Sequence, residues 1–299
     1  MIRLVRRMLD EVALRVCAGL ATCLVWHVAS AAVAKPLPLA EIDRVVVAAI
    51  PAWQGKPAEV LDRLDLSEPF ATVSQWTLVV ARDPDPSAMP GFTDPGALAV
   101  CLVKTLAVEC SEKYGPTKTY PWTNTAYALR TAKVVHAGAR ENAPLLLLQT
   151  CSTSGMNGNC DIRTVLYAYD RGVDRFHPVF VNDTRGSNNN QDARFVEHGP
   201  LRGDVIVNYP TDHAPYAYWI EVYARRGVGD YTRILRYRGH TGYGDGNVLA
   251  VADSEMPEIL RRLGKWQLGD ALPVPPQSPK GCGRLILRRG VEWCDFASR

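Results

Sequence analysis

The sequence predicts an all-β, mainly antiparallel protein built from repeated four-stranded sheets, arranged like a propeller or as open stacked sheets or a sandwich. Short β-branched and aromatic runs, separated by Gly, Pro, Asn and Asp, follow one another from Ala71 onward. Two 15-residue segments, "YAYDRGVDRFHPVFV" at 167–181 and "VYARRGVGDYTRILR" at 222–236, align without a gap. The runs around each copy fall into sets of four, so each copy indicates one antiparallel sheet.

Short helices are expected before the sheets. Segment 39–66 has apolar residues at helical spacing, and Pro57 lies near the start of its second half, where a helix accepts proline. We therefore assign residues 35–70 to an N-terminal helical segment.

The repeated β-sheet body is expected to span residues 71–253. A helix at 255–263, within the region 254–271, should follow it, and a Pro-rich linker at 272–281 then leads to a C-terminal hairpin at 282–299. The strands of the body are predicted at 71–81, 96–104, 129–138, 144–151, 163–171, 175–181, 193–199, 204–209, 217–226, 230–237 and 247–253.

The Arg-Gly-Val motif lies between the third and fourth strands of each set and predicts a hairpin tip. Gly172 and Gly227 stand where a tight turn requires a positive φ. The Arg of each motif should face water and the Val should pack, while Phe176 and Tyr231 pack across the returning strand. A third copy at 288–291 predicts the tip of the C-terminal hairpin.

Sets of four antiparallel strands that repeat every 50 to 60 residues are typical of β-propeller blades. In the segment from about Ala71 to Asp253 the chain resembles degenerate FG-GAP-type β-propeller repeats of secreted bacterial proteins. The resemblance implies blade-like sheets. The chain departs from the pattern because "GDGN" at 244–247 is only a fragment of a calcium loop, and because about three sheets are too few to close a propeller.

The N-terminus predicts export. Four Arg precede an apolar run at 16–26, and Ala32-Val33-Ala34 fits a signal-peptidase site, so residues 1–34 are expected to be a cleaved signal peptide. The apolar run is shorter than the roughly 20 residues that span a bilayer. We expect a periplasmic or secreted protein; lipid anchoring through Cys23 and an uncleaved anchor stay as alternatives.

The cysteines support an oxidising compartment. Two of the eight fall in the predicted signal peptide, and the other six form close pairs in the sequence. The spacings do not fit a zinc site, because no pair is separated by two to four residues. The predicted disulfides are Cys101–Cys110, Cys151–Cys160 and Cys282–Cys294.

The charge balance disfavours nucleic acid as a partner. Removal of residues 1–34 takes away four basic and two acidic side chains and lowers the formal net charge from +3 to +1. The mature chain carries no apolar run of membrane-spanning length, so no integral membrane span is expected. No cofactor motif occurs.

Catalytic motifs are weak. His240 and Asp245 lie in a Gly-rich loop, and Asp212 and His213 lie in a loop that contains two Pro, but loops of both kinds are usually strand connections. "SGMNG" at 154–158 lacks the spacing of a serine hydrolase nucleophile. No catalytic residue or metal ligand is therefore assigned.

The most polar loops are the candidate binding surface. They are 185–192 and 239–247, and they contain Asn188, Asn189, Asn190, Asp192, His240, Tyr243 and Asp245. We expect a binding or interaction module of the bacterial envelope, with a protein or glycan as its partner. The alternatives are a hydrolase of glycan or cell-wall material and an inhibitor of a foreign enzyme.

Overall fold

A computed structural model of the chain describes most of the predicted β body and its flanking helices. In the short strands at 88–89, 92–93, 284–288 and 291–295 only the backbone is described. The described residues are 37–50, 56–82, 88–89, 92–93, 97–105, 107–110, 126, 128–136, 143–153, 160–184, 192–211, 217–227, 229–239, 251–267, 284–288 and 291–295.

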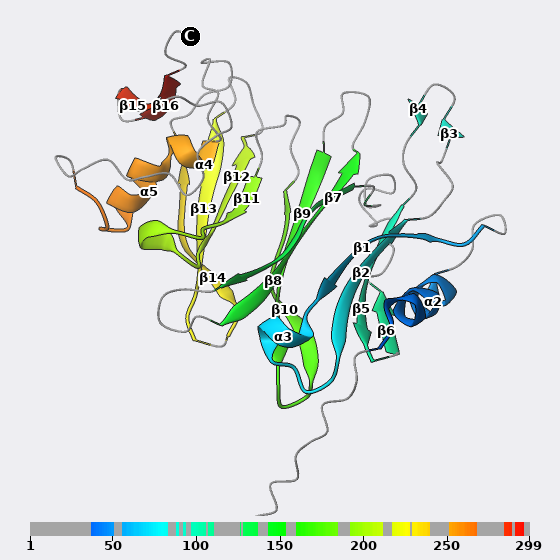
Figure 1. The fold of residues 1–299 in the computed structure, drawn as a ribbon. Helices are drawn as coiled ribbons and strands as arrows, with labels where there is room; N and C mark the ends of the chain where they lie inside the picture. Colours follow the sequence, from blue (N-terminus) through cyan, green and yellow to red (C-terminus); the bar gives the residue numbers. More distant parts are fainter. Residues whose placement is uncertain are drawn as a thin grey trace, which may run out of the picture. The chain divides into compact units, whose positions relative to one another are not determined.

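Three antiparallel four-stranded sheets form the body, which confirms the all-β prediction (Figure 1). Sheet 1 contains β1 (Glu59–Asp65), β2 (Trp76–Arg82), β5 (Leu98–Lys104) and β6 (Ala107–Cys110). Sheet 2 contains β7 (Ala128–His136), β8 (Pro144–Thr153), β9 (Cys160–Asp170) and β10 (Arg175–Thr184). Sheet 3 contains β11 (Asp192–Phe195), β12 (Val205–Pro210), β13 (Tyr218–Arg225) and β14 (Tyr231–Arg238).

Each sheet is a meander, because the strands of each sheet pair in chain order. Sheets 2 and 3 correspond to the two sets of four strands that the repeat predicts, with β9–β10 and β13–β14 as the hairpins of the Arg-Gly-Val copies. The third copy also bends a hairpin, between β15 (Arg284–Arg288) and β16 (Val291–Asp295). A short pair, β3 (Ala88–Met89) with β4 (Phe92–Thr93), was not predicted.

Helices precede sheet 1 and follow sheet 3 in the chain, and a single helical turn also lies in one strand connection of each of these two sheets. They are α2 (Leu39–Ala49), α3 (Ser67–Phe70), the 3-10 turn η1 (Gly199–Leu201), α4 (Val251–Ser254) and α5 (Met256–Arg262). Among the described residues, no helix is both long and apolar enough to cross a membrane.

Four apolar clusters give the order of the layers. Ile42 and Val46 of α2 pack on one face of sheet 1, and Trp76 on the other face packs with Phe176 of sheet 2. The opposite face of sheet 2 packs on sheet 3 through Phe180, and Ile259 of α5 packs on the far face of sheet 3. Helices thus cover the outer faces of sheets 1 and 3, as an open stack of sheets requires.

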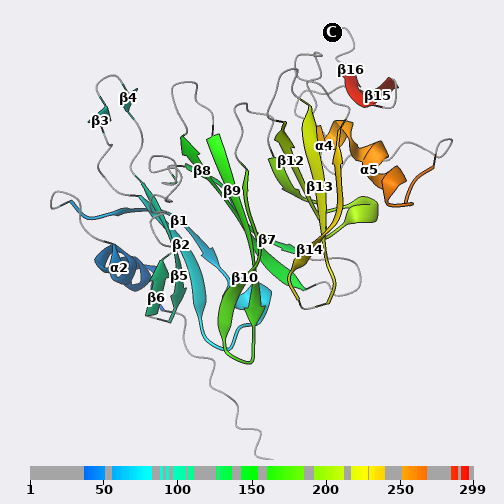
Figure 2. The same ribbon diagram turned by 180° about the vertical axis from the view of Figure 1, so that it is seen from behind.

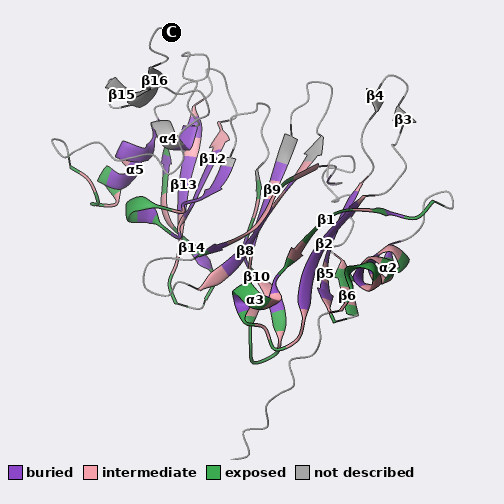
Figure 3. Cartoon of the chain, viewed as in Figure 1, coloured by how far each residue is buried: buried purple, intermediate pink, exposed green. Residues whose placement is uncertain are grey.

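Figure 2 shows the same sheets from behind, and Figure 3 shows that burial follows their layering. Most residues of β2 and β5, which occupy the middle of sheet 1, are buried, whereas the edge strand β1 is mostly exposed and the edge strand β6 alternates between exposed and half-buried residues. The tip of the β9–β10 hairpin is exposed as well. Central strands are buried because they have neighbours on both edges and layers on both faces.

Two predicted elements are wrong. Residues 59–65, predicted as part of a helix, form the edge strand β1. The predicted strand at 247–253 ends in helix α4, which begins at Val251. The first part of the predicted helical segment 39–66 does form a helix, α2, and the predicted helix at 255–263 is confirmed by α5.

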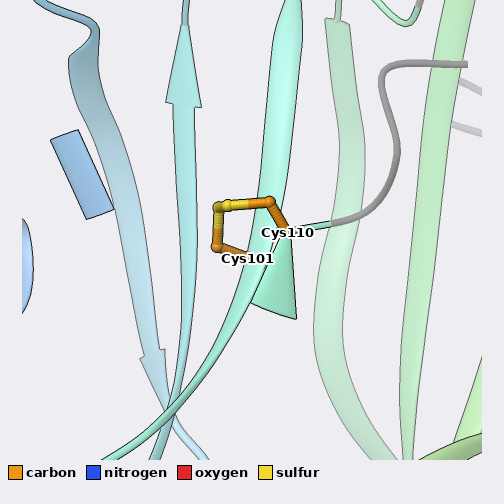
Figure 4. Close-up of a disulfide and its surroundings, with 2 residues drawn as sticks. All are labelled: Cys101 and Cys110. Carbon is orange, nitrogen blue, oxygen red and sulfur yellow. A yellow bond between two sulfur atoms is a disulfide. The ribbon is translucent and has the colours of Figure 1, made fainter. Parts of the chain in front are cut away.

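The disulfide Cys101–Cys110 is confirmed, between directly opposed residues of β5 and β6 (Figure 4). Cys151 of β8 is also disulfide-bonded. Its predicted partner Cys160 lies in β9, opposite Thr153, and that pairing stays a prediction. Cys294 lies in β16, whereas Cys282 falls outside the described residues.

Candidate functional site

The loops predicted to bind a partner lie largely outside the described residues. This holds for Asn188, Asn189 and Asn190 and for His240, Tyr243 and Asp245. Asp192 is the first residue of β11, where only its backbone is described. Asp212 and His213 also fall outside.

The first Arg-Gly-Val tip holds sheets 1 and 2 together through Asp174. The Asp174 carboxylate accepts hydrogen bonds from Ser74 Oγ (2.5 Å), Trp76 Nε1 (3.0 Å) and Tyr169 OH (2.6 Å). Lys104 Nζ forms an ion pair with Asp174 at 2.9 Å and also donates to the Asp174 carbonyl oxygen. Three of these four donors belong to sheet 1 or to the segment that leads into it, so the contacts connect the two sheets. We call this set of contacts around Asp174 the lock.

The electrostatics of the lock favour an ionised Asp174. Burial opposes the charge, but the hydrogen bonds from Ser74, Tyr169 and Lys104 outweigh it and hold the pKa of Asp174 well below its usual range. The pKa of Tyr169 is raised, first by burial and then by its hydrogen bond to Asp174. The lock is therefore charged throughout the neutral range.

The turn at this tip differs from the predicted one. The residue with positive φ is Asp174 (48°), and Gly172 does not have it; instead the Gly172 N–H donates to Asp170 Oδ1 at 2.7 Å. Val173 was expected to pack but is 67% exposed. Arg171 lies at the surface as expected, where Nη1 donates to the carbonyl oxygen of Ala71.

The second tip does not repeat the lock. Gly227 has φ 70°, as predicted, but Gly229 occupies the position that aligns with Asp174. Arg226 is exposed, and Tyr231 packs in the core between sheets 2 and 3. The motif therefore specifies a hairpin shape, and the residue three positions after its Arg decides whether that hairpin locks onto a neighbouring sheet.

The face of sheet 3 that looks toward sheet 2 changes from apolar to basic across the strands. Strand register places Tyr209, Trp219 and Arg238 in one row across β12, β13 and β14. The next row is Val207, Glu221 and Arg236. The third row is Val205, Tyr223 and Arg233. On β14 this face is thus a column of three arginines, which we call the Arg column (Arg233, Arg236 and Arg238).

A buried glutamate organises the Arg column. Glu221, only 5% exposed, accepts hydrogen bonds from Tyr223 OH (2.6 Å) and Tyr209 OH (3.2 Å). Arg233 Nη1 and Arg236 Nε form ion pairs with the same carboxylate at 3.0 and 3.1 Å. A buried carboxylate with four donors is well compensated, so it fixes the two arginines in place.

Burial and the charge of Glu221 also raise the pKa values of the two tyrosines that contact it, Tyr209 and Tyr223. Burial, and after it the hydrogen bond to Glu221, raises the pKa of Tyr223 to about 12. The pKa of Tyr209 is raised in the same direction, first by burial and then by the Glu221 charge. Both tyrosines therefore stay neutral and remain hydrogen-bond donors to the Glu221 carboxylate.

The Arg column stays open to solvent although it is anchored. The Arg233 and Arg236 side chains are 47% and 44% exposed, and Arg238 is exposed as well. The Arg236 guanidinium stacks on the Trp219 ring at 4.5 Å, so Trp219 is half-buried under an arginine. The three arginines of the Arg column face one carboxylate, that of Glu221, so the column carries a net positive charge.

This face is continuous with a predicted binding loop. Arg238 is followed directly by Gly239, where the loop 239–247 begins. The Gly239 N–H donates to the Tyr218 carbonyl oxygen, which fixes the start of the loop at the row of Trp219 and Arg238. The described residues contain no group of three or more His, Cys, Asp or Glu placed to hold a metal ion.

Comparison with known proteins found no family, no curated protein and no solved structure that matches this chain. The resemblance to FG-GAP repeats therefore stays a prediction.

Proposed function

We propose that this chain is an exported binding module and that the Arg column of sheet 3 contacts its partner. The signal-like N-terminus supports export, and the Cys101–Cys110 disulfide is compatible with it. The observation that carries the proposal is an exposed set of three arginines beside Trp219 and Tyr209, two of which Glu221 holds in place. Arg, Trp and Tyr are the residue types that dominate the binding energy of protein interfaces.

The polar cluster is better suited to binding than to proton transfer. Tyr209, Tyr223, Arg233 and Arg236 all contact the Glu221 carboxylate, so its oxygens are already occupied by donors of the protein itself. Arginine does not lose its proton at physiological pH, so Arg233 and Arg236 supply charge and hydrogen bonds only.

Site-specific photo-crosslinking tests the proposal. A photoreactive amino acid replaces Arg238 in one variant and Arg226 in the matched control, and both variants are expressed in the cells that make the protein. Arg226 is a suitable control because it is exposed on the same hairpin but at its tip. We expect a discrete crosslinked partner from position 238 only. Equal crosslinking from both positions, or none from 238, would contradict the proposal.

A further inference from the structure

The outer edge of β14 is available to another strand in the described part of the chain. The order of sheet 3 is β11, β12, β13, β14, so β14 pairs with β13 on one side and is the last strand of its sheet. It contains eight residues and is therefore about 27 Å long, enough for a partner strand of similar length. An edge strand presents backbone N–H and C=O groups to any extended chain that matches it.

The side chains beside this edge select the charge of such a chain. Arg236 and Arg238 are two residues apart and point to the same face, so they repeat at about 7 Å along the strand. Arg233 joins the same face because the register with β13 shifts between Val222 and Tyr223. An added strand places its alternate side chains next to this column, at about 5 Å between directly opposed Cβ atoms.

We infer that the edge of β14 accepts an extended acidic segment of a protein partner, which adds to sheet 3 as a fifth strand and sets alternate carboxylates beside the Arg column. The inference rests on the proposed function, since it names the partner that the same face binds.

The arginines keep donors for this partner. A guanidinium has five N–H donors, and Glu221 takes one from Arg233 and one from Arg236, while Tyr209 OH accepts from Arg236 Nη2. Because these contacts hold the side chains in place, a partner carboxylate loses less conformational entropy on pairing with them.

The same charges disfavour other occupants. A second copy would bring its own Arg column against this one, and like charges on neighbouring strands repel each other. A sugar ring would need the open face of Trp219, which the Arg236 guanidinium already covers at 4.5 Å. An acidic polypeptide can pair with the backbone groups at the β14 edge and can also place its carboxylates beside the Arg column.

The test uses the mature protein and a labelled ten-residue peptide in which Glu and Thr alternate, with binding measured by fluorescence anisotropy at low salt. Two peptides are matched controls: one with the five Glu in a block, and one with Lys in place of Glu. We expect the alternating peptide to bind at least tenfold more tightly than the block peptide, and the Lys peptide not to bind. Equal binding of the alternating and block peptides would overturn the inference, because it would show attraction without strand pairing.

Backbone methylation tests strand addition directly. In an added antiparallel strand, alternate N–H groups face β14 and the others face solvent. Of two peptides N-methylated at the two alternate sets, only one should lose binding. Loss in both, or in neither, would contradict addition to the edge.

Protein variants assign the binding to the Arg column. Arg238→Glu should lower the affinity for the alternating peptide at least tenfold, whereas Arg226→Glu should leave that affinity unchanged. Equal urea midpoints of the two variants would show that both are folded. Failure of the peptide to bind while position 238 still crosslinks to a partner would overturn strand addition and leave the proposed function standing. Peptide binding without any crosslink at position 238 would contradict the proposed function instead.

Discussion

Asp174 is the residue on which the junction of sheets 1 and 2 depends. Asp174→Asn removes the charge that pairs with Lys104 but keeps a residue that tolerates positive φ, so the change isolates the electrostatic contribution. We expect the free energy of unfolding to fall by about 2 kcal/mol, because hydrogen bonds to a charged group are worth about 1.5–3 kcal/mol. Urea unfolding followed by Trp fluorescence measures it.

Asp230→Asn is the matched control for this substitution. Asp230 is exposed at the tip of the other repeated hairpin, and we expect a change of no more than about 0.5 kcal/mol there. If the two variants lose equal stability, the lock around Asp174 does not stabilise the fold.

Asp204 should make stability depend on pH. Burial raises its pKa from 3.8 to about 6, and the charge of Lys265 opposes the shift only in part. Because the folded state holds the proton more tightly, the associated stabilisation is complete below pH 3.8 and is lost as the pH rises through about 6. Asp204→Asn should remove this loss and raise stability at pH 7.5 by about 1 kcal/mol, allowing for partial solvent screening.

Unfolding midpoints at pH 5 and pH 7.5 measure the effect. The wild-type protein should lose more stability between these values than Asp204→Asn does. A pH dependence that persists unchanged in the variant would assign it to other groups.

The two Arg-Gly-Val hairpins show what a repeated motif can and cannot predict. The sequence correctly predicts both hairpins and the packing of Phe176 and Tyr231. It does not predict the lock, because two of the donors to Asp174, Ser74 and Trp76, lie 100 and 98 positions earlier in the chain. Only tertiary packing brings those segments together.

Strand β1 was predicted as a helix for an identifiable reason. Val60 and Leu64 are its half-buried residues, and their spacing of four fits both a helical period and an alternating strand. A register shift after Val60 and the exposure of this edge strand hide the period of two. At Val251 a strand was predicted and a helix, α4, is found, because an apolar run does not distinguish a buried strand from a buried helix.

The sequence contains the three residues of the Arg column but does not predict that they lie on one face of the sheet. Arg233 and Arg236 occur in the predicted strand 230–237 and Arg238 follows it directly, but the spacing of three between the first two suggests opposite faces. The register shift opposite Val222 and Tyr223 puts all three on one face, and the burial of Glu221 anchors two of them. Neither feature follows from alternation alone.

The three sheets should unfold as one unit. Phe176 packs in the core shared by sheets 1 and 2, with its ring centroid 4.9 Å from that of Phe70, and Phe180 packs in the core shared by sheets 2 and 3, at 5.6 Å from Tyr231. Sheet 2 therefore contributes to both cores, and no sheet keeps its buried faces if it separates from its neighbour. Phe176→Ala and Phe180→Ala should each cost about 3–5 kcal/mol.

Both substitutions should shift a single transition, seen at the same urea concentration by far-UV circular dichroism and by Trp fluorescence. Trp76 in sheet 1 and Trp219 in sheet 3 report on opposite ends of the layer order. If Phe180→Ala lowered the midpoint for sheet 3 and left the environment of Trp76 native, the sheets would be independent units. A shared shift is expected because loss of either core exposes apolar surface of sheet 2, and the remaining core cannot offset that exposure.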